Sequence, residues 1–355
     1  MDGRGASLHF PRTPWGCGAG CALPAPLPLL LPSPLKVVAD STPPRPIAGS
    51  GTGAGPEAGA GERAPPLPPV LVLGAAVVAF SWAGPLIRFT DAAAVAVAAW
   101  RLLLSVAFLA AVVTLRRDGW APLFRLRRRE WGLALGAGVL LALHFWSWIA
   151  SVHYTTIASS VVLVSTQPLF VALLSVLYLR EHPRRGEWIG MGIAVMGAAW
   201  IGWGDLALGP DALFGDALAL GAAVLAAAYY VVGRNLRRKV DLWSYVTVVY
   251  GAAAITLTLA VLATPGVSLV RGYGSGDWLV FLGLAAGPMM IGHTGVNYAL
   301  RYVRAYLANL AVLGEPVGAT LIAWVLPAIA ETPSLSTVVG GGLILLGVGV
   351  ALRAR

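Results

Sequence analysis

The sequence predicts an all-α integral membrane protein with ten transmembrane helices, arranged as two inverted five-helix repeats. Three observations carry this prediction: apolar stretches of membrane length, an internal repeat, and basic residues in alternate loops. Hydrophobic residues make up 57% of the 355 residues, and charged residues make up 12%. A helix needs about 20 mainly apolar residues to cross a bilayer, and a soluble core of this size would need far more polar surface to cover it. The chain is therefore expected in a membrane.

Ten apolar segments divide most of the chain, and the linkers between them are short, as in a compact helical bundle. Many segments end near Trp or Tyr, which is typical of side chains at the membrane–water interface. These residues are Trp120, Trp131, Trp188, Trp243, Trp278 and Tyr302. The segments run over residues 67–88, 92–115, 131–152, 156–179, 187–204, 214–233, 243–264, 278–300, 304–326 and 335–352.

The second half of the chain repeats the first. At a constant offset of 148 residues, Tyr154 aligns with Tyr302 and Pro168 with Pro316. Two additional residues in the second copy raise the offset to 150, which then holds to the end. The pairs at this offset are Glu181 and Glu331, Pro183 and Pro333, Gly190 and Gly340, Gly192 and Gly342, and Gly197 and Gly347. An ordered series with one gap indicates duplication. The glycines of the fifth and tenth helices allow close helix approach in packing, which can include a dimer face.

Basic residues predict the orientation. With the N-terminus in the cytoplasm, the inner loops carry seventeen Arg and Lys residues, and the outer loops carry Arg88 and Arg271. This positive-inside pattern places both termini in the cytoplasm, with the chain in the cytoplasmic (inner) membrane. Five helices per copy is an odd number, so the second copy is inverted. The inner set is Arg116, Arg117, Arg125, Arg127, Arg128, Arg129, Arg180, Arg184, Arg185, Arg234, Arg237, Arg238, Lys239, Arg301, Arg304, Arg353 and Arg355. Because these charges lie at the ends of apolar segments, the net charge of +9 predicts no nucleic-acid partner.

The expected organisation has five parts. The leader is rich in Pro, Gly and Ala and is expected to be disordered. Its Cys17 and Cys21 lack the neighbouring His or Cys residues of a metal site, so we expect no metal and no cofactor. The parts are the leader 1–66, the first repeat 67–204, an external linker 205–213, the second repeat 214–352 and a cytoplasmic tail 353–355.

Glu315 and Arg101 are ionisable residues near the middle of apolar segments, where a charge costs about 2.5–3.5 kcal/mol on insertion scales. Glu315 is a candidate for coupling protons or binding a substrate amine, and the alternative is a structural carboxyl group. Arg101 is a candidate for binding a substrate carboxylate or neutralising Glu315, and a structural network between helices is equally compatible with the sequence.

Pro168 and Pro316 occupy equivalent places in the two copies. Each removes a backbone donor and is expected to free the carbonyl one turn earlier, at Val164 and Val312. Such groups are tolerated in a membrane where they face protein or a wet cavity. The prolines therefore predict a pair of kinks lining a path, with bent packing as the alternative. In the first case Gln167 and Glu315, which precede the prolines, face the cavity from opposite repeats.

Further polar and aromatic residues are weaker candidates for the same site. His144 and His293 lie within one residue of equivalence and could relay protons, although a hydrogen-bonded packing role explains them as well. An aromatic and amide lining is the other candidate role, with core or interfacial packing as its alternative. The lining candidates are Trp146, Trp148, Tyr229, Tyr230, Asn297 and Tyr298.

Taken together, these features resemble the EamA family of the drug/metabolite transporter (DMT) superfamily. The residues that carry the resemblance are Trp100-Arg101-Leu102, the run Tyr154–Pro168, Gly314–Pro316, the helix-closing Glu181 and Glu331, and the glycine-rich fifth and tenth helices. The resemblance covers about residues 67–352. The two-residue insertion before Glu331 is a departure from the first copy.

The resemblance implies a secondary transporter that moves a small organic metabolite by alternating access. The cargo would be an amino acid, a related compound or a toxic compound. Export is the expected direction, import or exchange is the alternative, and an integral-membrane enzyme is a remote one. No P-loop occurs, so ATP-driven pumping would need another subunit. The expected partners are the substrate and the lipid bilayer. Proton coupling, and the choice between monomer and homodimer, remain open.

Overall fold

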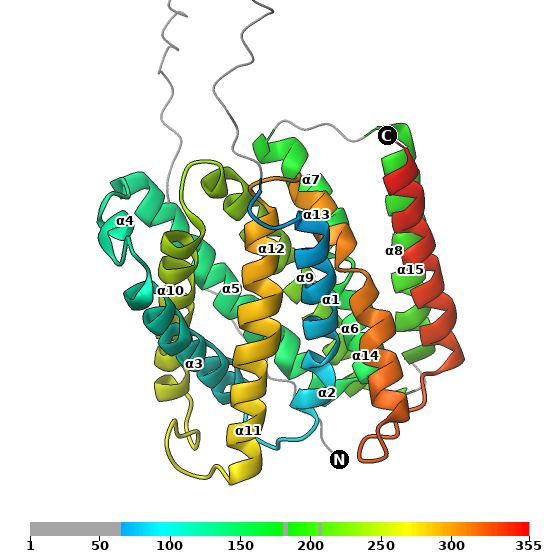
Figure 1. Ribbon diagram of the computed structural model, residues 1–355. Coiled ribbons are helices and arrows are strands. Elements are labelled where there is room, and N and C mark those ends of the chain that lie inside the picture. Colours follow the sequence, from blue (N-terminus) through cyan, green and yellow to red (C-terminus); the bar gives the residue numbers. More distant parts are fainter. Residues whose placement is uncertain (1–64, 180–183, 206–207, 355) are drawn as a thin grey trace, which may run out of the picture. The chain divides into compact units, whose positions relative to one another are not determined.

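The computed structural model describes residues 65–179, 184–205 and 208–354, and every regular element in these ranges is a helix (Figure 1). Glu181 and nearly all of the expected leader lie outside the described residues. The first half of the chain contains α1 (Pro69–Ser81), α2 (Ala83–Ile87), α3 (Ala94–Leu115), α4 (Ala121–Phe124), α5 (Arg128–Tyr154), α6 (Ile157–Val164), α7 (Gln167–Leu179) and α8 (Arg185–Asp205). The second half contains α9 (Pro210–Arg237), α10 (Leu242–Ala263), α11 (Ser275–Leu284), the π-helix η2 (Ala285–His293), α12 (Thr294–Ala299), α13 (Ala305–Ala311), α14 (Gly314–Val325) and α15 (Leu335–Arg353).

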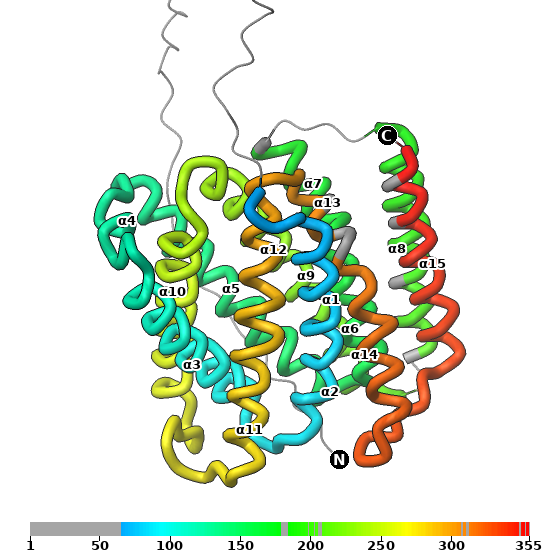
Figure 2. The backbone as a smooth tube through the Cα atoms, viewed as in Figure 1, coloured from blue at the N-terminus to red at the C-terminus, as the bar shows by residue number. Residues whose placement is uncertain are grey.

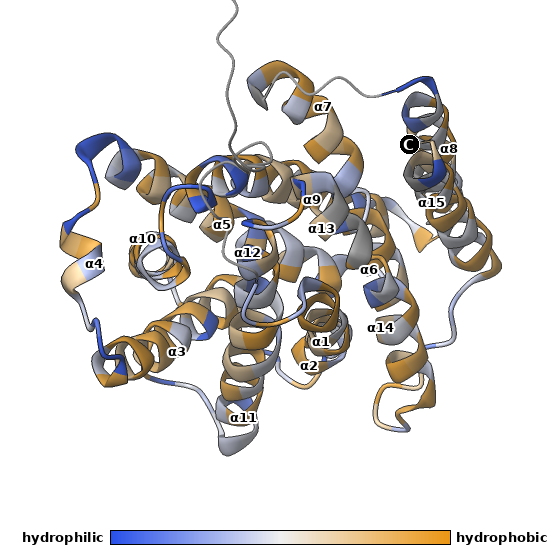
Figure 3. Cartoon of the chain, turned by 45° about the horizontal axis from the view of Figure 1, so that its top comes forward, coloured by the Kyte–Doolittle hydropathy of each residue, from blue (hydrophilic) through white to orange (hydrophobic). Residues whose placement is uncertain are grey.

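Seven helical stretches in the described residues are long and apolar enough to cross a membrane, and a shorter apolar helix covers Leu335–Ala351. Hydrophobic residues cover most of the length of the helices, and hydrophilic residues gather at several of their ends (Figure 3). The seven stretches are Pro69–Ile87, Ala94–Leu115, Arg128–Tyr154, Ile157–Tyr178, Pro210–Arg237, Leu242–Ala263 and Ser275–Ala299.

Side-chain caps fix several helix starts. Thr156 accepts a hydrogen bond from the Ser159 N–H at the start of α6, at 3.0 Å. Ser334 accepts one from the Thr337 N–H at the start of α15, at 3.1 Å. Each cap satisfies a backbone donor that the helix itself leaves unpaired. These two turns hold helices that carry or flank the central site.

Equivalent proline positions interrupt one helix in each half. The first break separates α6 from α7, with Pro168 the second residue of α7, and the other separates α13 from α14, with Pro316 the third residue of α14. A proline cannot donate the backbone bond that continues a helix. The expected kinks are therefore present as full breaks. The expectation of a free carbonyl is wrong at Val312, because the Glu315 N–H donates to that oxygen at 2.9 Å and tightens the turn.

Glycines allow α8 and α15 to pack side by side along one edge of the helical unit (Figure 2). A Cβ atom added at Gly190 would overlap the carbonyl oxygen of Gly347, and one added at Gly347 would overlap that of Gly190. Gly197 and Gly340 stand in the same mutual relation. The two helices are therefore antiparallel, and the contact at one end is repeated with exchanged partners at the other.

The two ends of the helical unit can be named by their arginines. The Arg88 end carries the C-terminus of α2, the α10–α11 link and the α14–α15 link, and the Arg234 end carries the C-terminus of α9 and the α3–α5 link (Figure 1). The start of α1 and the end of α15 both lie at the Arg234 end (Figure 1). The chain therefore begins and finishes its described course on the same side.

Candidate functional site

The breaks in the two halves open onto one central cavity. Its volume is about 40 Å³, which is room for about three waters. Helices from both halves of the chain form the wall, so neither half builds the cavity alone. The lining residues are Phe80, Ala83, Arg101, His144, Phe145, Trp148, Val164, Ser165, Gln167, Pro168, Tyr230, His293, Asn309, Val312, Leu313 and Glu315.

Arg101 is a buried cation in this wall. Its side chain is 1% exposed, and its guanidinium carbon lies 4.0 Å from the centroid of the Phe145 ring. No residue in the described part of the chain accepts a hydrogen bond from its Nε or Nη1 atom. The ring stabilises the charge through a cation–π interaction, but donors without acceptors are costly away from water. The side chain thus retains hydrogen-bonding capacity for an anionic group in the cavity.

The position of Arg101 depends on its neighbour on α3. The indole Nε1 of Trp100 donates to the carbonyl oxygen of Leu269 at 2.8 Å, and its ring packs edge-on against Trp278 at 4.5 Å between centroids. These contacts fix the rotation of α3 about its axis. Because the next residue along a helix points about 100° away, Arg101 is turned from the α10–α11 link towards the cavity.

Glu315 lies in the first turn of α14 and is half-buried. The partial positive charge of a helix N-terminus favours a carboxylate in this turn. Glu315 and Arg101 are close enough to interact electrostatically. Even so, Glu315 and Arg101 form no ion pair or hydrogen bond with one another, and the ion pair found among the described residues joins Arg88 to Glu331. Both charges therefore remain available to a bound molecule.

Gln167 contacts the opposite break directly. Its Nε2 donates to Oδ1 of Asn309 at 2.5 Å, and the Asn309 amide is held by its own donation to the Ala305 carbonyl oxygen at 2.8 Å. Asn309 is 1% exposed. This bond joins α7 to α13, so the two broken helices are connected at the cavity through side chains from opposite halves of the chain.

The two histidines meet in the cavity wall. His144 bonds the carbonyl oxygen of Ala222 through Nδ1 at 2.9 Å, so this nitrogen is the donor. His293 Nδ1 lies 3.2 Å from the hydroxyl of Tyr230, and its ring packs edge-on against Phe80 and Phe145, each at 4.9 Å. The ring centroids of the histidines are 6.2 Å apart. The residue pair is therefore packed and hydrogen-bonded while it still borders the cavity.

Four other predicted lining residues differ in their placement. Trp148 lines the cavity, as expected. Asn297 is fully buried one turn beyond His293, where its amide donates to the Tyr229 hydroxyl at 2.5 Å. Tyr298 lies outside the cavity and donates to the Leu67 carbonyl oxygen at 2.8 Å. Trp146 is 43% exposed, because it lies two residues from both His144 and Trp148 and so occupies the opposite face of α5.

Asn309, Phe80 and Phe145 are absent from the residues that the sequence pattern singles out for the site. A buried amide in the apolar run that precedes Glu315 was a usable signal for Asn309, because polar residues inside membrane helices are rare and tend to be functional. The two phenylalanines carry no such signal, since nothing in an apolar helix marks which ring faces a cavity. In the described residues, no group of three or more His, Cys, Asp or Glu side chains could hold a metal ion.

Comparison with known proteins identifies the family. The sequence model of the EamA-like transporter family matches the chain twice, over residues 68–203 and 213–353. The chain belongs to this family. The EamA-family protein is 28% identical over 274 residues to an uncharacterized transporter of Archaeoglobus fulgidus, covering 74% of its own chain and 89% of that relative. It is 28% identical over 213 residues to the uncharacterized transporter YdfC of Bacillus subtilis, covering 59% and 67% of the two chains.

The crystal structure of another protein has the same fold. It matches with a TM-score of 0.61 and 24% identity, over 81% of this chain and 98% of that chain. Family membership and the apolar helices make the chain a multi-pass membrane protein of a transporter family.

Proposed function

We propose that the protein is a secondary transporter that moves a small organic metabolite across the cytoplasmic membrane by alternating access. The observation that carries the proposal is the buried guanidinium of Arg101, whose Nε and Nη1 have no acceptor among the described residues although the side chain borders a cavity. The cavity lies where two helices break, which is the usual place for substrate in transporters with discontinuous helices.

The ten-helix inverted arrangement belongs to this proposal. Seven stretches qualify as spans by length and composition, and α8, the α13–α14 pair and α15 would supply the remaining three. The mutual contacts of Gly190 with Gly347 and of Gly197 with Gly340 support it, because a two-fold axis produces contacts with exchanged partners. The two matches of the family support the duplication. The positive-inside pattern then places the Arg234 end and both termini in the cytoplasm.

The charges of the cavity favour a zwitterionic cargo such as an amino acid or a related compound. Arg101 and the N-termini of α7 and α14 attract a carboxylate, since half-helix N-termini carry partial positive charge. Glu315 attracts an amine and offers a site for a coupling proton. Export is the proposed direction, because family resemblance favours it.

Flux in proteoliposomes tests the function. Purified protein would be reconstituted, loaded with a panel of amino acids, organic acids and amines, and assayed for efflux and uptake under an imposed pH gradient. Wild type should move at least one zwitterionic compound, and Arg101→Ala should abolish that flux. Arg271→Ala, which removes an exposed loop arginine, is the matched control and should leave it unchanged.

Each outcome bears on one part of the proposal. Unchanged flux in Arg101→Ala would contradict the assignment of the site. Flux of wild type towards the side of the Arg234 end alone would replace export with import, and strict dependence on a compound at the opposite side would indicate exchange.

A further inference from the structure

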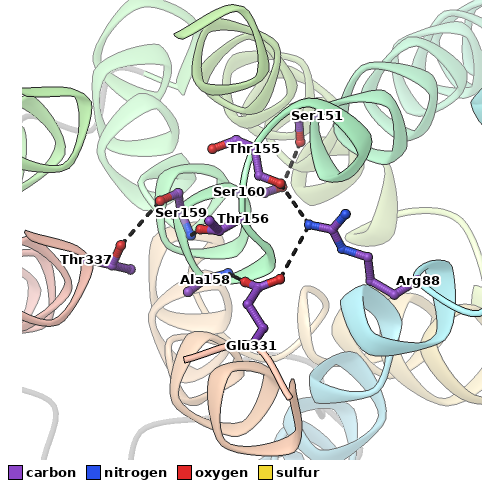
Figure 4. A network of polar contacts seen from close by, with 9 residues as sticks. All are labelled: Arg88, Ser151, Thr155, Thr156, Ala158, Ser159, Ser160, Glu331 and Thr337. Carbon is purple, nitrogen blue, oxygen red and sulfur yellow. Dashed lines mark hydrogen bonds and ion pairs between the residues drawn. The ribbon is translucent and has the colours of Figure 1, made fainter. Parts of the chain in front are cut away.

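An ion pair joins segments from both halves of the chain at the Arg88 end. Nη2 of Arg88 lies 3.4 Å from Oε2 of Glu331, and the same nitrogen donates to the Thr155 carbonyl oxygen at 2.9 Å. The other carboxylate oxygen of Glu331 accepts the Ala158 N–H at 3.3 Å. Figure 4 shows the two side chains pointing towards one another across the turn between α5 and α6. Glu331 has no basic residue close to it along the chain, and its partner Arg88 is 243 residues away.

The pair is also matched to the two helix ends that it touches. Thr155 is the C-cap of α5, and Ala158 is in the first turn of α6. Carbonyl oxygens at a helix C-terminus favour a cation, and N–H groups at a helix N-terminus favour an anion. Arg88 and Glu331 therefore each satisfy one end of the α5–α6 turn while they pair with one another.

The turn itself is held independently of the ion pair. The Ser151 and Ser160 hydroxyls are 2.6 Å apart across it, and the Ser159 hydroxyl lies 3.3 Å from that of Thr337 on α15. These buried contacts leave the turn in place without Arg88 or Glu331. The parts that the ion pair ties to the turn are the end of α2 and the α14–α15 link.

The α14–α15 link is bent to bring Glu331 to this place. Ala330 has a φ of 47°, the one positive φ at a non-glycine residue in the described ranges. The backbone then turns back, so that the Glu331 N–H donates to the Ala323 carbonyl oxygen at 3.1 Å. A left-handed alanine is unfavourable in isolation, and backbone bonds from Ala330 to Leu326 and from Glu331 to Ala323 hold the link in this bent form.

The tied segments belong to helices that line the central cavity. Ala83 of α2 and Glu315 of α14 both border the cavity. The Arg88–Glu331 ion pair lies beyond the other ends of these two helices. The ion pair is partly exposed, with 31% of the Arg88 side chain and 19% of the Glu331 side chain accessible. Partly exposed pairs are weak enough to break and re-form.

We propose that Arg88 and Glu331 form a latch that keeps the cavity closed at the Arg88 end and breaks each time the cavity opens there. This inference rests on the proposed alternating access. Release would free α2 and the α14–α15 link from the α5–α6 turn, with the turn as the fixed seat. The cavity would then be reached between α2 and α14.

Thiol labelling from the Arg88 end tests the latch without any substrate. In full-length protein with Cys17→Ser and Cys21→Ser, Ser165→Cys would place a thiol in the cavity wall. A membrane-impermeant maleimide would be added to sealed cells or vesicles. Val270→Cys, in the α10–α11 link at the same end, identifies the preparation in which this end faces the reagent.

In that preparation, Arg88→Ala and Glu331→Gln should each speed labelling of position 165 by about fivefold or more, the effect of losing 1–2 kcal/mol of closing contacts. Arg88→Lys keeps the charge and should label close to the parent rate. Arg271→Ala is the control for removing an arginine at this end. Should Arg88→Ala not yield folded protein, Glu331→Gln carries the test. Unchanged labelling in Glu331→Gln would overturn the latch and leave the transport proposal standing. If labelling is accelerated but no compound is transported, the latch would stand and the transport proposal would be overturned.

Discussion

The two broken helices share one geometry and differ in chemistry. The break between α6 and α7 and the break between α13 and α14 lie at equivalent places, each beside a proline and each on the cavity. The residue before the proline is Gln167 in one and Glu315 in the other. Gln167 is hydrogen-bonded to Asn309 of the opposite break, whereas no described residue bonds the Glu315 carboxylate, and its electrostatic neighbour is Arg101.

The reason for this difference lies six residues earlier in each copy, in the helix before the break. At the repeat offset of 148 residues, Asn309 corresponds to Val161. Val161 is fully buried and apolar, so a symmetric bond from Glu315 to the first copy has no acceptor or donor. Duplication thus explains the two breaks, and the substitution at one pair of positions leaves a carboxylate available to cargo or protons. At the breaks, the second copy supplies the unbonded carboxylate, and the first copy supplies an amide that bonds to Asn309.

Of the substitutions at the two breaks, the largest effect is expected from removing the charge of the Glu315 carboxylate. Glu315→Gln should lower flux about a hundredfold, which corresponds to about 2.7 kcal/mol, and should abolish any pH dependence of transport. Gln167→Ala should lower flux less than tenfold, because position 167 contributes a bond between helices. Flux in proteoliposomes measures both.

A double variant sharpens the same point. Gln167→Glu combined with Glu315→Gln keeps one carboxylate at the breaks, but next to Asn309. It should remain as slow as Glu315→Gln alone. Recovery of flux in the double variant would mean that a carboxylate works equally well at either break, and would contradict the chemical difference between the two breaks.

Glycine substitutions in α8 and α15 test the contacts that the two copies make symmetrically, Gly190 with Gly347 and Gly197 with Gly340. Gly190→Ala and Gly340→Ala should each destabilise the protein by about 1–3 kcal/mol, since each added Cβ meets backbone of the other helix. The loss would be measured by thermal or denaturant unfolding in micelles. Gly192→Ala and Gly342→Ala are equivalent controls, because an added Cβ there meets nothing within 4 Å. Equal losses at Gly190 and Gly192 would contradict the packing.

Asn309→Val makes the second copy resemble the first at the position that distinguishes them. The variant loses the bond to Gln167, so we expect a stability loss of about 1 kcal/mol, measured by unfolding in micelles. Gln167→Leu removes the same bond from the other side. The double variant should lose less than the sum of the two single losses, and strict additivity would show that the bond contributes nothing.

A smaller effect is expected at the histidine that lies in the second copy. Tyr230→Phe removes the hydroxyl that bonds His293 at 3.2 Å and should slow flux by less than about fivefold, the loss of one neutral hydrogen bond. Tyr298→Phe removes a hydroxyl that bonds Leu67 outside the cavity and should leave flux unchanged. A larger effect at Tyr298 than at Tyr230 would move the site away from the cavity.

Local sequence signals account for much of this arrangement and not for the rest. Apolar length predicts the helices, proline predicts the breaks, and the glycine series predicts that α8 and α15 each approach a neighbouring helix closely, because each signal lies within one helix or one turn. That these two helices pack against one another depends on the fold. The π-helical course of Ala285–His293 contains Pro288, but a proline by itself does not distinguish a π-helical segment from a break. The outward face of Trp146 could have been read from its helical position relative to His144. The pairing of Arg88 with Glu331 could not, because it depends on the fold bringing distant segments together.

The inverted relation of the two copies is the central claim, and one topology measurement tests it most directly. Single cysteines at Asp118, in the α3–α5 link, and at Val270, in the α10–α11 link, occupy corresponding loops of the two copies and are both exposed. With Cys17 and Cys21 replaced by serine, an impermeant maleimide would be applied to intact cells and to inside-out vesicles. The account predicts that Val270→Cys labels only in cells and Asp118→Cys only in inside-out vesicles. Labelling of both from the same side would contradict the inverted repeat and the alternating-access mechanism built on it.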